Sequence, residues 1–185
     1  MSRLAVLSDI HGDHHALTHA LAQILPAAPD AILLLGDLLN HGPRNPVPAG
    51  YAPADVAFTL NQHARRLIAV RGNCDSEVDQ MLLQFPCLAP YNTLLLGARK
   101  LCMTHGHLYT LEQLALGSGD VCLSGHTHLP GITRSAEGVW QINPGSVTFP
   151  RGGFAPSYGW LDEQGCRLVD MRSGEVFSQC DWSAG

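Results

Sequence analysis

The chain has 185 residues, 45% of them hydrophobic, and a formal net charge of −5 at pH 7 with neutral histidines. This size suits one domain that buries a proper core without cross-links, so we expect a single domain over residues 1–185. The negative charge excludes a broad basic face for a nucleic-acid backbone, and a long polynucleotide is not an expected partner.

The six cysteines are scattered and form no Cys-x-x-Cys pair, which disfavours a zinc knuckle or a redox motif. We interpret them as buried, reduced thiols of a cytoplasmic protein. The apolar start of the chain is interrupted by Asp9 and His11. It is therefore too short for a signal peptide and far too short to span a membrane.

The first half of the chain alternates short apolar runs with helix-like segments. Continuous apolar runs are typical of strands that are covered on both faces. The Pro- and Gly-rich stretch 40–53 is predicted to be a loop that walls a site next to Asp37. Ser76 is the predicted N-cap of a short helix. We expect strands at 4–7, 30–35 and 67–70, and helices at 13–25, 53–65 and 76–83.

The second half is predicted to be mostly strand. Residues 92–96 and 100–104 form two predicted strands around a Gly97-Ala98 turn, followed by a helix at 110–116 and a strand at 121–123. From Ile132 onward, turn signals separate short strands, which predicts a β meander. Its expected strands are 131–134, 139–142, 157–161, 166–171 and 176–181.

The strand 121–123 leads into Ser124-Gly125-His126-Thr127-His128. In an extended chain, residues two apart project to the same side, so His126 and His128 are expected to face one small volume. Gly125 is expected to permit a sharp backbone turn there. Two imidazoles placed in this way suit a metal ion.

Five apolar runs in the chain each end in a side chain that can bind a metal. In open α/β sheets, sites form outside the carboxyl ends of the strands, so these residues can converge although they span most of the chain. Each alone has an ordinary structural reading, such as a helix cap or a turn residue. Together they indicate one metal centre, with the candidate ligands Asp9, His11, Asp37, Asn73, His105, His126 and His128.

The mixture of ligands indicates more than one ion. Two carboxylates, one amide and four imidazoles are too many donors for a four-coordinate structural zinc. They suit two divalent ions, with Mn²⁺ expected first and Fe²⁺ or Zn²⁺ as alternatives, and with one carboxylate as a bridge. Two dications against two carboxylates leave about two positive charges, which favours an anionic substrate such as a small phosphodiester.

Five short motifs follow one another along the chain: Asp9-x-His11, Gly36-Asp37, Gly72-Asn73-x-Asp75, His105-Gly106-His107 and Gly125-His126-x-His128. This ordered set resembles the calcineurin-like metallophosphoesterase superfamily. Within that superfamily, three stretches resemble the small bacterial YfcE-type phosphodiesterases: Asn40-His41-Gly42-Pro43-Arg44-Asn45, Arg71-Gly72-Asn73-Cys74-Asp75 and Asn143-Pro144-Gly145-Ser146. The resemblance implies a four-layer α/β/β/α sandwich of two mixed β-sheets flanked by helices. It also implies phosphodiester hydrolysis by attack of a metal-bridging hydroxide, and a homo-oligomer, either a dimer or a tetramer.

The resemblance also implies how two ions share the ligands. One ion is expected to be bound by Asp9, His11, Asp37 and His128. The other is expected to be bound by Asp37, Asn73, His105 and His126.

Cys74 departs from the superfamily pattern, since many members have a histidine there that assists the leaving group. A thiol is a poor substitute, because its unperturbed pKa is near ~8.5 and it donates weak hydrogen bonds. Diesters with good leaving groups are therefore expected to be hydrolysed best. The alternative is that Cys74 is only a small filler beside the site.

Six further residues are weaker candidates for the chemistry. Arg44 and Arg71 are expected to contact the substrate phosphate, with Asn40 and His41 beside them, although a solvated loop arginine is the commoner case. His41 and His107 are candidates to replace the missing acid or to orient ligands. Asp75 is expected to hold the tautomer of a ligand histidine.

Two alternatives stay open. The first is a phosphomonoesterase on the same site, which Cys74 disfavours. The second is a non-catalytic scaffold, because the resemblance extends to the retromer subunit of this fold. The seven retained candidate ligands argue against a scaffold, which has no chemical reason to keep them.

Overall fold

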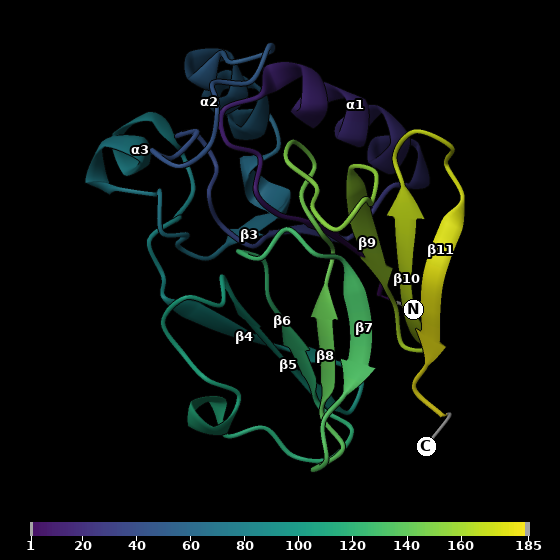
Figure 1. Cartoon of the computed structure of the whole chain (residues 1–185). Helices are drawn as coiled ribbons and strands as arrows, with labels where there is room; N and C mark the ends of the chain where they lie inside the picture. Colours follow the sequence, from purple (N-terminus) through teal and green to yellow (C-terminus); the bar gives the residue numbers. More distant parts are fainter. Residues whose placement is uncertain (1, 184–185) are drawn as a thin grey trace.

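Two mixed β-sheets pack face to face in the computed structural model, which describes residues 2–183 (Figure 1). Met1 and the last two residues of the expected domain lie outside the described residues. The first sheet has the order β11-β10-β9-β1-β2-β3, and the second has the order β4-β5-β6-β8-β7.

The strands of the first sheet are β1 (Leu4–Leu7), β2 (Ala31–Leu34), β3 (Leu67–Ala69), β9 (Ser157–Leu161), β10 (Gly165–Asp170) and β11 (Val176–Asp181). Those of the second are β4 (Tyr91–Leu96), β5 (Arg99–Thr104), β6 (Val121–Leu123), β7 (Gly131–Arg134) and β8 (Trp140–Asn143). β1, β2 and β3 run parallel to one another, as do β5, β6 and β8. The expected pair of mixed sheets is therefore confirmed.

Each helix begins where the sequence supplies a local start signal. The α1 helix (His14–Ile24) begins after Asp13, whose carboxylate accepts a hydrogen bond from the Ala16 N–H at 3.0 Å. The α2 helix (Pro53–Asn61) begins with proline, whose missing N–H is not needed in a first turn. The backbone N–H of Ser76 donates to the Asp79 carboxylate at 2.6 Å at the start of α3 (Glu77–Leu82).

The first three predicted helices are all shorter in the structure, and the second differs most. The second ends at Asn61, and the chain continues through a separate 3₁₀ turn, η2 (Ala64–Arg66). A similar turn, η1 (Leu25–Ala27), follows α1. Among the described residues, none of the helices is both long enough and apolar enough to cross a membrane.

Three hydrophobic cores separate four layers. Alternate residues of the central strands point to opposite faces, so Ala5 and Leu7 pack under α1 and α2, while Leu4 and Val6 pack against the second sheet. This two-sided burial is why the strand β1 is a continuous apolar run. A third, smaller core around Leu114 covers the outer face of the second sheet.

The outer layer on the second sheet differs from the prediction. The helix expected at 110–116 is only a 3₁₀ turn, η3 (Glu112–Leu114), which ends at Ala115 with φ 49°. The segment lies over Cys102 and Cys122 by inserting Leu114 and packing Leu111 and Leu116 beside it. Apolar spacing alone did not distinguish this packed loop from a helix.

The expected single β meander is wrong as a topology. β7 and β8 join the second sheet, where β8 pairs with β6, whereas β9 pairs with β1 and extends the first sheet with β10 and β11. Strand periodicity identifies the strands but not their partners. The segment 144–156 crosses from one sheet to the other and passes beside the loops of the candidate site.

Candidate active site

All seven candidate ligands lie in the loops that follow β1, β2, β3, β5 and β6. The carboxyl ends of these strands lie at one end of the two packed sheets (Figure 1). Asp9, His11, Asp37, His105 and His128 are buried there, each at most 3% exposed. Asn73 is exposed and His126 is half-buried, so these two lie at the rim.

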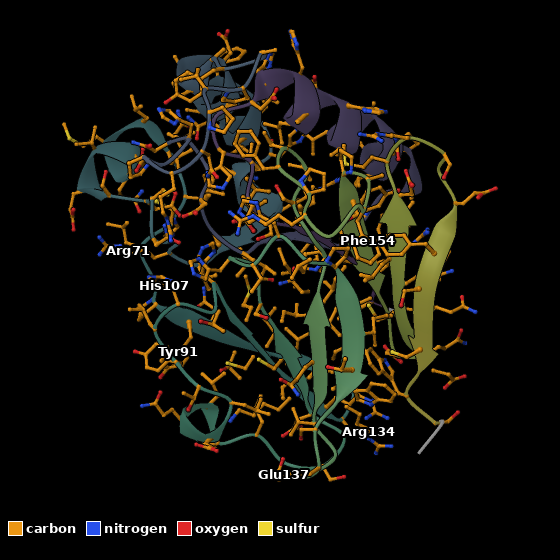
Figure 2. All side chains as sticks on the ribbon, in the orientation of Figure 1. Arg71, Tyr91, His107, Arg134, Glu137 and Phe154 are labelled. Carbon is orange, nitrogen blue, oxygen red and sulfur yellow. The ribbon has the colours of Figure 1, made fainter. Side chains whose placement is uncertain are left out.

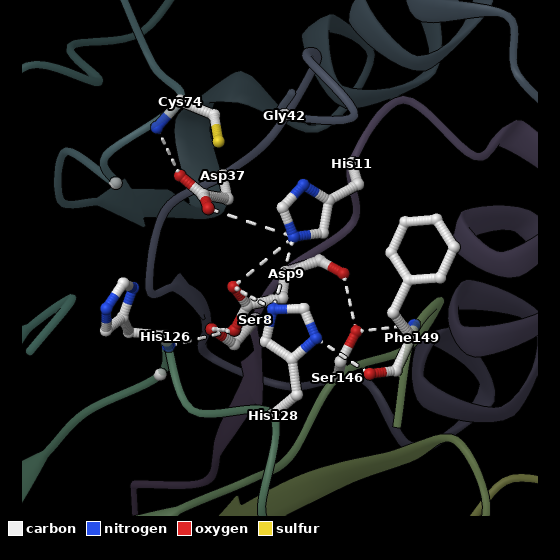
Figure 3. A network of polar contacts seen from close by, with 12 residues as sticks. Ser8, Asp9, His11, Asp37, Gly42, Cys74, His126, His128, Ser146 and Phe149 are labelled. Carbon is white, nitrogen blue, oxygen red and sulfur yellow. Dashed lines mark hydrogen bonds and ion pairs between the residues drawn. The ribbon is translucent and has the colours of Figure 1, made fainter. Parts of the chain in front are cut away.

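The buried residues point their polar atoms at one another (Figure 3). His128 Nε2 lies 3.2 Å from Asp9 Oδ1 and 3.3 Å from His11 Nε2. His11 Nε2 lies 3.6 Å from Asp9 Oδ1 and 3.8 Å from Asp37 Oδ2. His105 Nε2 lies 3.5 Å from Asp37 Oδ2 and 4.0 Å from Asp9 Oδ1. The cluster is therefore one continuous polar centre.

Backbone carbonyls orient the three buried imidazoles. A carbonyl can only accept, so each Nδ1 must carry a hydrogen, and a neutral ring then presents a bare Nε2 lone pair to the centre. Second contacts of this kind are typical of metal-binding histidines. The pairs are His11 Nδ1 with Asn40 O at 3.0 Å, His105 Nδ1 with Leu35 O at 2.6 Å, and His128 Nδ1 with Phe149 O at 2.7 Å.

Each buried carboxylate has one oxygen held by donors and one oxygen that faces the histidines. Asp9 Oδ2 accepts from the Ser8 hydroxyl at 2.6 Å and from the His126 N–H at 3.1 Å, while Asp9 Oδ1 is buried without a hydrogen bond. Asp37 Oδ1 accepts from the Cys74 N–H at 2.7 Å. A buried carboxylate oxygen is costly unless a donor or a cation satisfies it. The free oxygens and the bare Nε2 atoms together fit a divalent cation.

Electrostatics in the cluster favour positive charge. Burial by itself would raise the pKa of the Asp9 carboxyl, but the close approach of His11 and His128 holds it well below its usual range. Burial would lower the pKa of His105, but its bond to Asp37 and the charge of Asp9 raise it to about 9. The two carboxylates thus favour a proton on His105 at neutral pH, and a divalent cation competes for the same place.

Three overlapping groups of three residues could each hold a metal ion. In each group every residue offers one ligand atom, and these atoms lie within 4.8 Å of one another. Asp9 joins His11 and His128 in one group, and joins Asp37 and His105 in another. The third group combines His11 and Asp37 with Cys74, a residue that sequence reasoning did not consider as a ligand. Within the described residues, His126 belongs to none of these groups. Asn73 Oδ1 lies beside the second group, 3.1 Å from His105 Nε2.

The backbone at the site is strained. Asp9, His11, Asp37, His126 and His128 all have positive φ, and they make up five of the seven such non-glycine residues in the described part of the chain. Such conformations cost about 1–3 kcal/mol each and concentrate at functional sites. The extended backbone expected at His126 and His128 is wrong, since φ is 65° and 61° there. The chain has left β6 at Leu123, and the turn sets each ring separately.

Gly125 is required by close packing. A Cβ at this position would lie 2.0 Å from Ser8 Oγ and 2.9 Å from Asp9 Oδ2. We expect Gly125→Ala to displace the Asp9 carboxylate, to weaken divalent metal binding by at least about ten-fold and to lower the unfolding free energy by about 1–3 kcal/mol.

Calorimetric metal titration and denaturant unfolding measure these two effects. The control is Gly131→Ala, because a Cβ there meets nothing within 4 Å. Wild-type metal affinity in Gly125→Ala would contradict this reading of the packing.

Asp75 has a different contact from the one expected. Its carboxylate holds no histidine, because backbone carbonyls orient those rings. It accepts instead from the N–H groups of Asp37, Leu38 and Gly72 at 2.8, 2.8 and 2.7 Å. Burial and the charge of Asp37 raise the pKa of Asp75 to about 6, against these hydrogen bonds. Asp75 therefore positions the Asp37 loop.

A cavity of about 290 Å³ opens beside the cluster. Of the predicted substrate and acid residues, Arg44 and Cys74 line it. Burial, and then the charge of Asp37, raise the pKa of the Cys74 thiol to about 12. Arg151 and Thr127 also line the cavity, and sequence reasoning did not single them out. The Gly152-Gly153 pair that follows Arg151 is a turn signal in the sequence. It does not indicate that this turn lies beside His128.

The other four predicted residues do not line this cavity. The Asn40 side-chain oxygen accepts a hydrogen bond from the Gly42 N–H at 2.8 Å, and the His41 ring packs edge-on against the Tyr51 ring. Arg71 Nε donates to the Asp75 carbonyl at 3.1 Å. Figure 2 shows Arg71 and His107 on the side of α3 and β4, and the His107 ring packs against the rings of His105 and His126, with centroids 5.2 and 5.9 Å away. Their assigned roles stay predictions.

The end of β8 and the loop that follows it form hydrogen bonds to the backbone of the candidate site. The Ser146 hydroxyl donates to the Asp9 carbonyl at 2.8 Å, and the Asn143 amide donates to the Gly125 carbonyl at 2.8 Å. Figure 3 shows Ser146 and Phe149 next to His128. The Asn-Pro-Gly-Ser motif indicated this loop, and its contacts depend on the crossing between the sheets.

Comparisons with known proteins agree with this geometry. Residues 2–165 match the calcineurin-like phosphoesterase superfamily domain. The chain is 47% identical to phosphodiesterase YfcE of Escherichia coli K12 over 180 residues, which cover 97% of both chains. A solved structure of E. coli YfcE, described as a phosphoesterase, has 46% identity and a TM-score of 0.92 over 97% of this chain and 98% of that one.

More distant structures share the fold alone. Vacuolar protein sorting 29 from Cryptosporidium parvum is 16% identical, with a TM-score of 0.64 over 97% of this chain and 98% of that one. The match over residues 2–165 and the near full-length similarity to YfcE lead to one conclusion: the chain belongs to the calcineurin-like phosphoesterase superfamily.

Proposed function

We propose that the chain is a metal-dependent phosphodiesterase that hydrolyses small phosphodiesters. The observation that carries this proposal is the buried cluster itself, in which three Nε2 atoms and the free oxygens of Asp9 and Asp37 face one centre beside an open cavity. The near full-length relative named as a phosphodiesterase supports the same reaction class.

Two divalent ions would be held at this centre. Asp9, His11 and His128 would bind one, and Asp37 and His105 the other, with Asn73 and His126 joining from the rim. Because Asp9 and Asp37 both lie between the two sets of histidines, either carboxylate is placed to be shared. When bound, such ions supply a hydroxide nucleophile at neutral pH and stabilise negative charge on phosphate oxygens, and Mn²⁺ is the expected ion.

The chain's own residues position the substrate and limit the leaving-group chemistry. Arg44 lines the cavity and is placed to attract an anionic substrate. Cys74 stands at the same wall as a weak donor, so protonation of a poor leaving group receives little help from it. This favours diesters with good leaving groups over monoesters.

Two other functions compete with this proposal. A phosphomonoesterase would need an acid that the cavity lining does not supply strongly. A scaffold draws support from the fold shared with the vacuolar sorting protein, but that likeness at 16% identity concerns the fold alone. The strained backbone around five candidate ligands is a cost that favours a working metal centre.

We expect protein stripped of metal with a chelator to be inactive and to regain hydrolysis of bis-p-nitrophenyl phosphate on addition of Mn²⁺. The reason is that the Cys74 thiol at the cavity has its pKa raised to about 12 and therefore stays protonated, and a protonated thiol is a poor nucleophile. Release of p-nitrophenolate measures turnover, with p-nitrophenyl phosphate as the monoester comparison. Absence of turnover with each of Mn²⁺, Fe²⁺, Co²⁺, Ni²⁺ and Zn²⁺ would rule out the catalytic proposal.

The remaining expectations belong to the same proposal. All six cysteines are free, including Cys166 and Cys180, which lie opposite each other on neighbouring strands. Free thiols in this arrangement support a reducing, cytoplasmic location. A single domain, a small-molecule substrate and a homo-oligomer complete the proposal.

A further inference from the structure

Two arginines line the cavity beside the candidate metal centre and come from different loops. Arg44 belongs to the loop between β2 and α2, and Arg151 follows the crossing between the sheets. Within residues 2–183, neither guanidinium forms an ion pair or a hydrogen bond. The chain as a whole carries a net charge of −5, whereas these two unpaired guanidinium groups place positive charge at the cavity.

The loops that carry the two arginines are held in place by backbone hydrogen bonds, although both side chains are exposed. The Arg151 N–H donates to the His128 carbonyl at 3.1 Å, and the carbonyl of nearby Phe149 holds the His128 ring. Next to Arg44, Asn45 closes a turn by donating through its backbone N–H to Gly42 at 3.2 Å. A Cβ at Gly42 would lie 2.8 Å from Cys74 Sγ, so this turn lies directly against the site.

Charge balance separates these arginines from the reacting phosphate. Two dications held by Asp9 and Asp37 would leave a charge of about +2, which a diester monoanion and a hydroxide neutralise. Asp37 is the only acidic residue among those that line the cavity. The charges of Arg44 and Arg151 are then left without a partner, and arginine is the side chain best suited to a second phosphate or carboxylate.

We propose that Arg44 and Arg151 form a second anion-binding subsite, so that the preferred substrate is a phosphodiester that carries an additional phosphate. This inference rests on the proposed function and narrows its substrate class. The volume of about 290 Å³ is at the small end for ligand pockets, so the two phosphates belong to one nucleotide-sized group. Arg151 is then a specificity residue.

The test compares two p-nitrophenyl esters of a nucleoside 5′-phosphate, one with a 3′-phosphate and one without, on the Mn²⁺-loaded enzyme. Arg151→Ala is expected to raise KM for the 3′-phosphorylated ester by about ten-fold and KM for the other ester by less than about two-fold, with kcat unchanged. Arg151→Lys, which keeps the charge, is expected to retain part of the preference. The control is Arg134→Ala, because Arg134 lies on β7 at the opposite end of the second sheet (Figure 2).

A binding measurement separates this inference from the proposed function. By calorimetry, Arg151→Ala is expected to raise the Kd for the nucleoside 3′,5′-bisphosphate by about ten-fold. The Kd for the 5′-monophosphate is expected to stay unchanged. Equal losses for both ligands, or no loss for either, would overturn the second subsite. If the protein shows no turnover but Arg151→Ala still weakens binding of the bisphosphate alone, the second subsite is supported and the phosphodiesterase proposal is ruled out.

Discussion

Asp37→Asn is expected to reduce kcat for an aryl phosphodiester by at least about 100-fold, because it removes a charged oxygen between two sets of candidate ligands. Asp37 Oδ2 lies 3.5 Å from His105 Nε2 and 3.8 Å from His11 Nε2, so it faces both sets. An amide of the same shape carries no charge and is a weaker ligand for a hard divalent ion. The measurement is steady-state hydrolysis with Mn²⁺, together with metal content per chain.

The fold of the variant has to be shown separately. The melting temperature without metal establishes that Asp37→Asn is folded, and the rise on adding Mn²⁺ reports metal binding. We expect the variant to lose most of that rise. Asp55→Asn is the matched control, because Asp55 is an exposed acid in the first turn of α2. Full activity of Asp37→Asn would contradict a centre in which Asp37 is a shared ligand.

Cys74→His is expected to raise monoester hydrolysis relative to diester hydrolysis by about ten-fold or more, because it supplies a positioned acid at the cavity wall. Cys74 lines the cavity, and its backbone N–H is fixed by Asp37 at 2.7 Å. Its thiol, with a pKa raised to about 12, stays protonated at neutral pH but donates only a weak hydrogen bond. A histidine titrates near neutrality and donates a strong one.

The turn at Gly42 limits how the new ring is placed. A Cβ at Gly42 would lie 2.8 Å from Cys74 Sγ, so the backbone of this turn lies close to the side chain at position 74. The assay compares kcat/KM for p-nitrophenyl phosphate and for its diester across pH. Cys180→His, at a half-buried cysteine on β11, controls for the addition of a histidine. An unchanged ratio of the two activities would show that Cys74 does not limit monoester turnover.

Local sequence patterns determined most elements of the fold. Continuous apolar runs indicated β1 and β2, and local patterns placed helix starts near residues 13, 53 and 76, because strand burial and helix capping depend on neighbouring residues. The same patterns did not determine that β8 pairs with β6 while β9 pairs with β1. Strand pairing depends on contacts between residues that are distant in the chain.

The sequence by itself also named the candidate ligands and the chemistry they suit. Their residue types, and their places after apolar strands, depend on local order and are visible in one dimension. Tertiary structure alone decided which of them are buried together, which oxygen of Asp9 stays free and that carbonyls, not Asp75, orient the histidines. It also decided that Arg151 lines the same cavity as Arg44, because this requires two loops that are distant in the chain to lie at one end of the sheets.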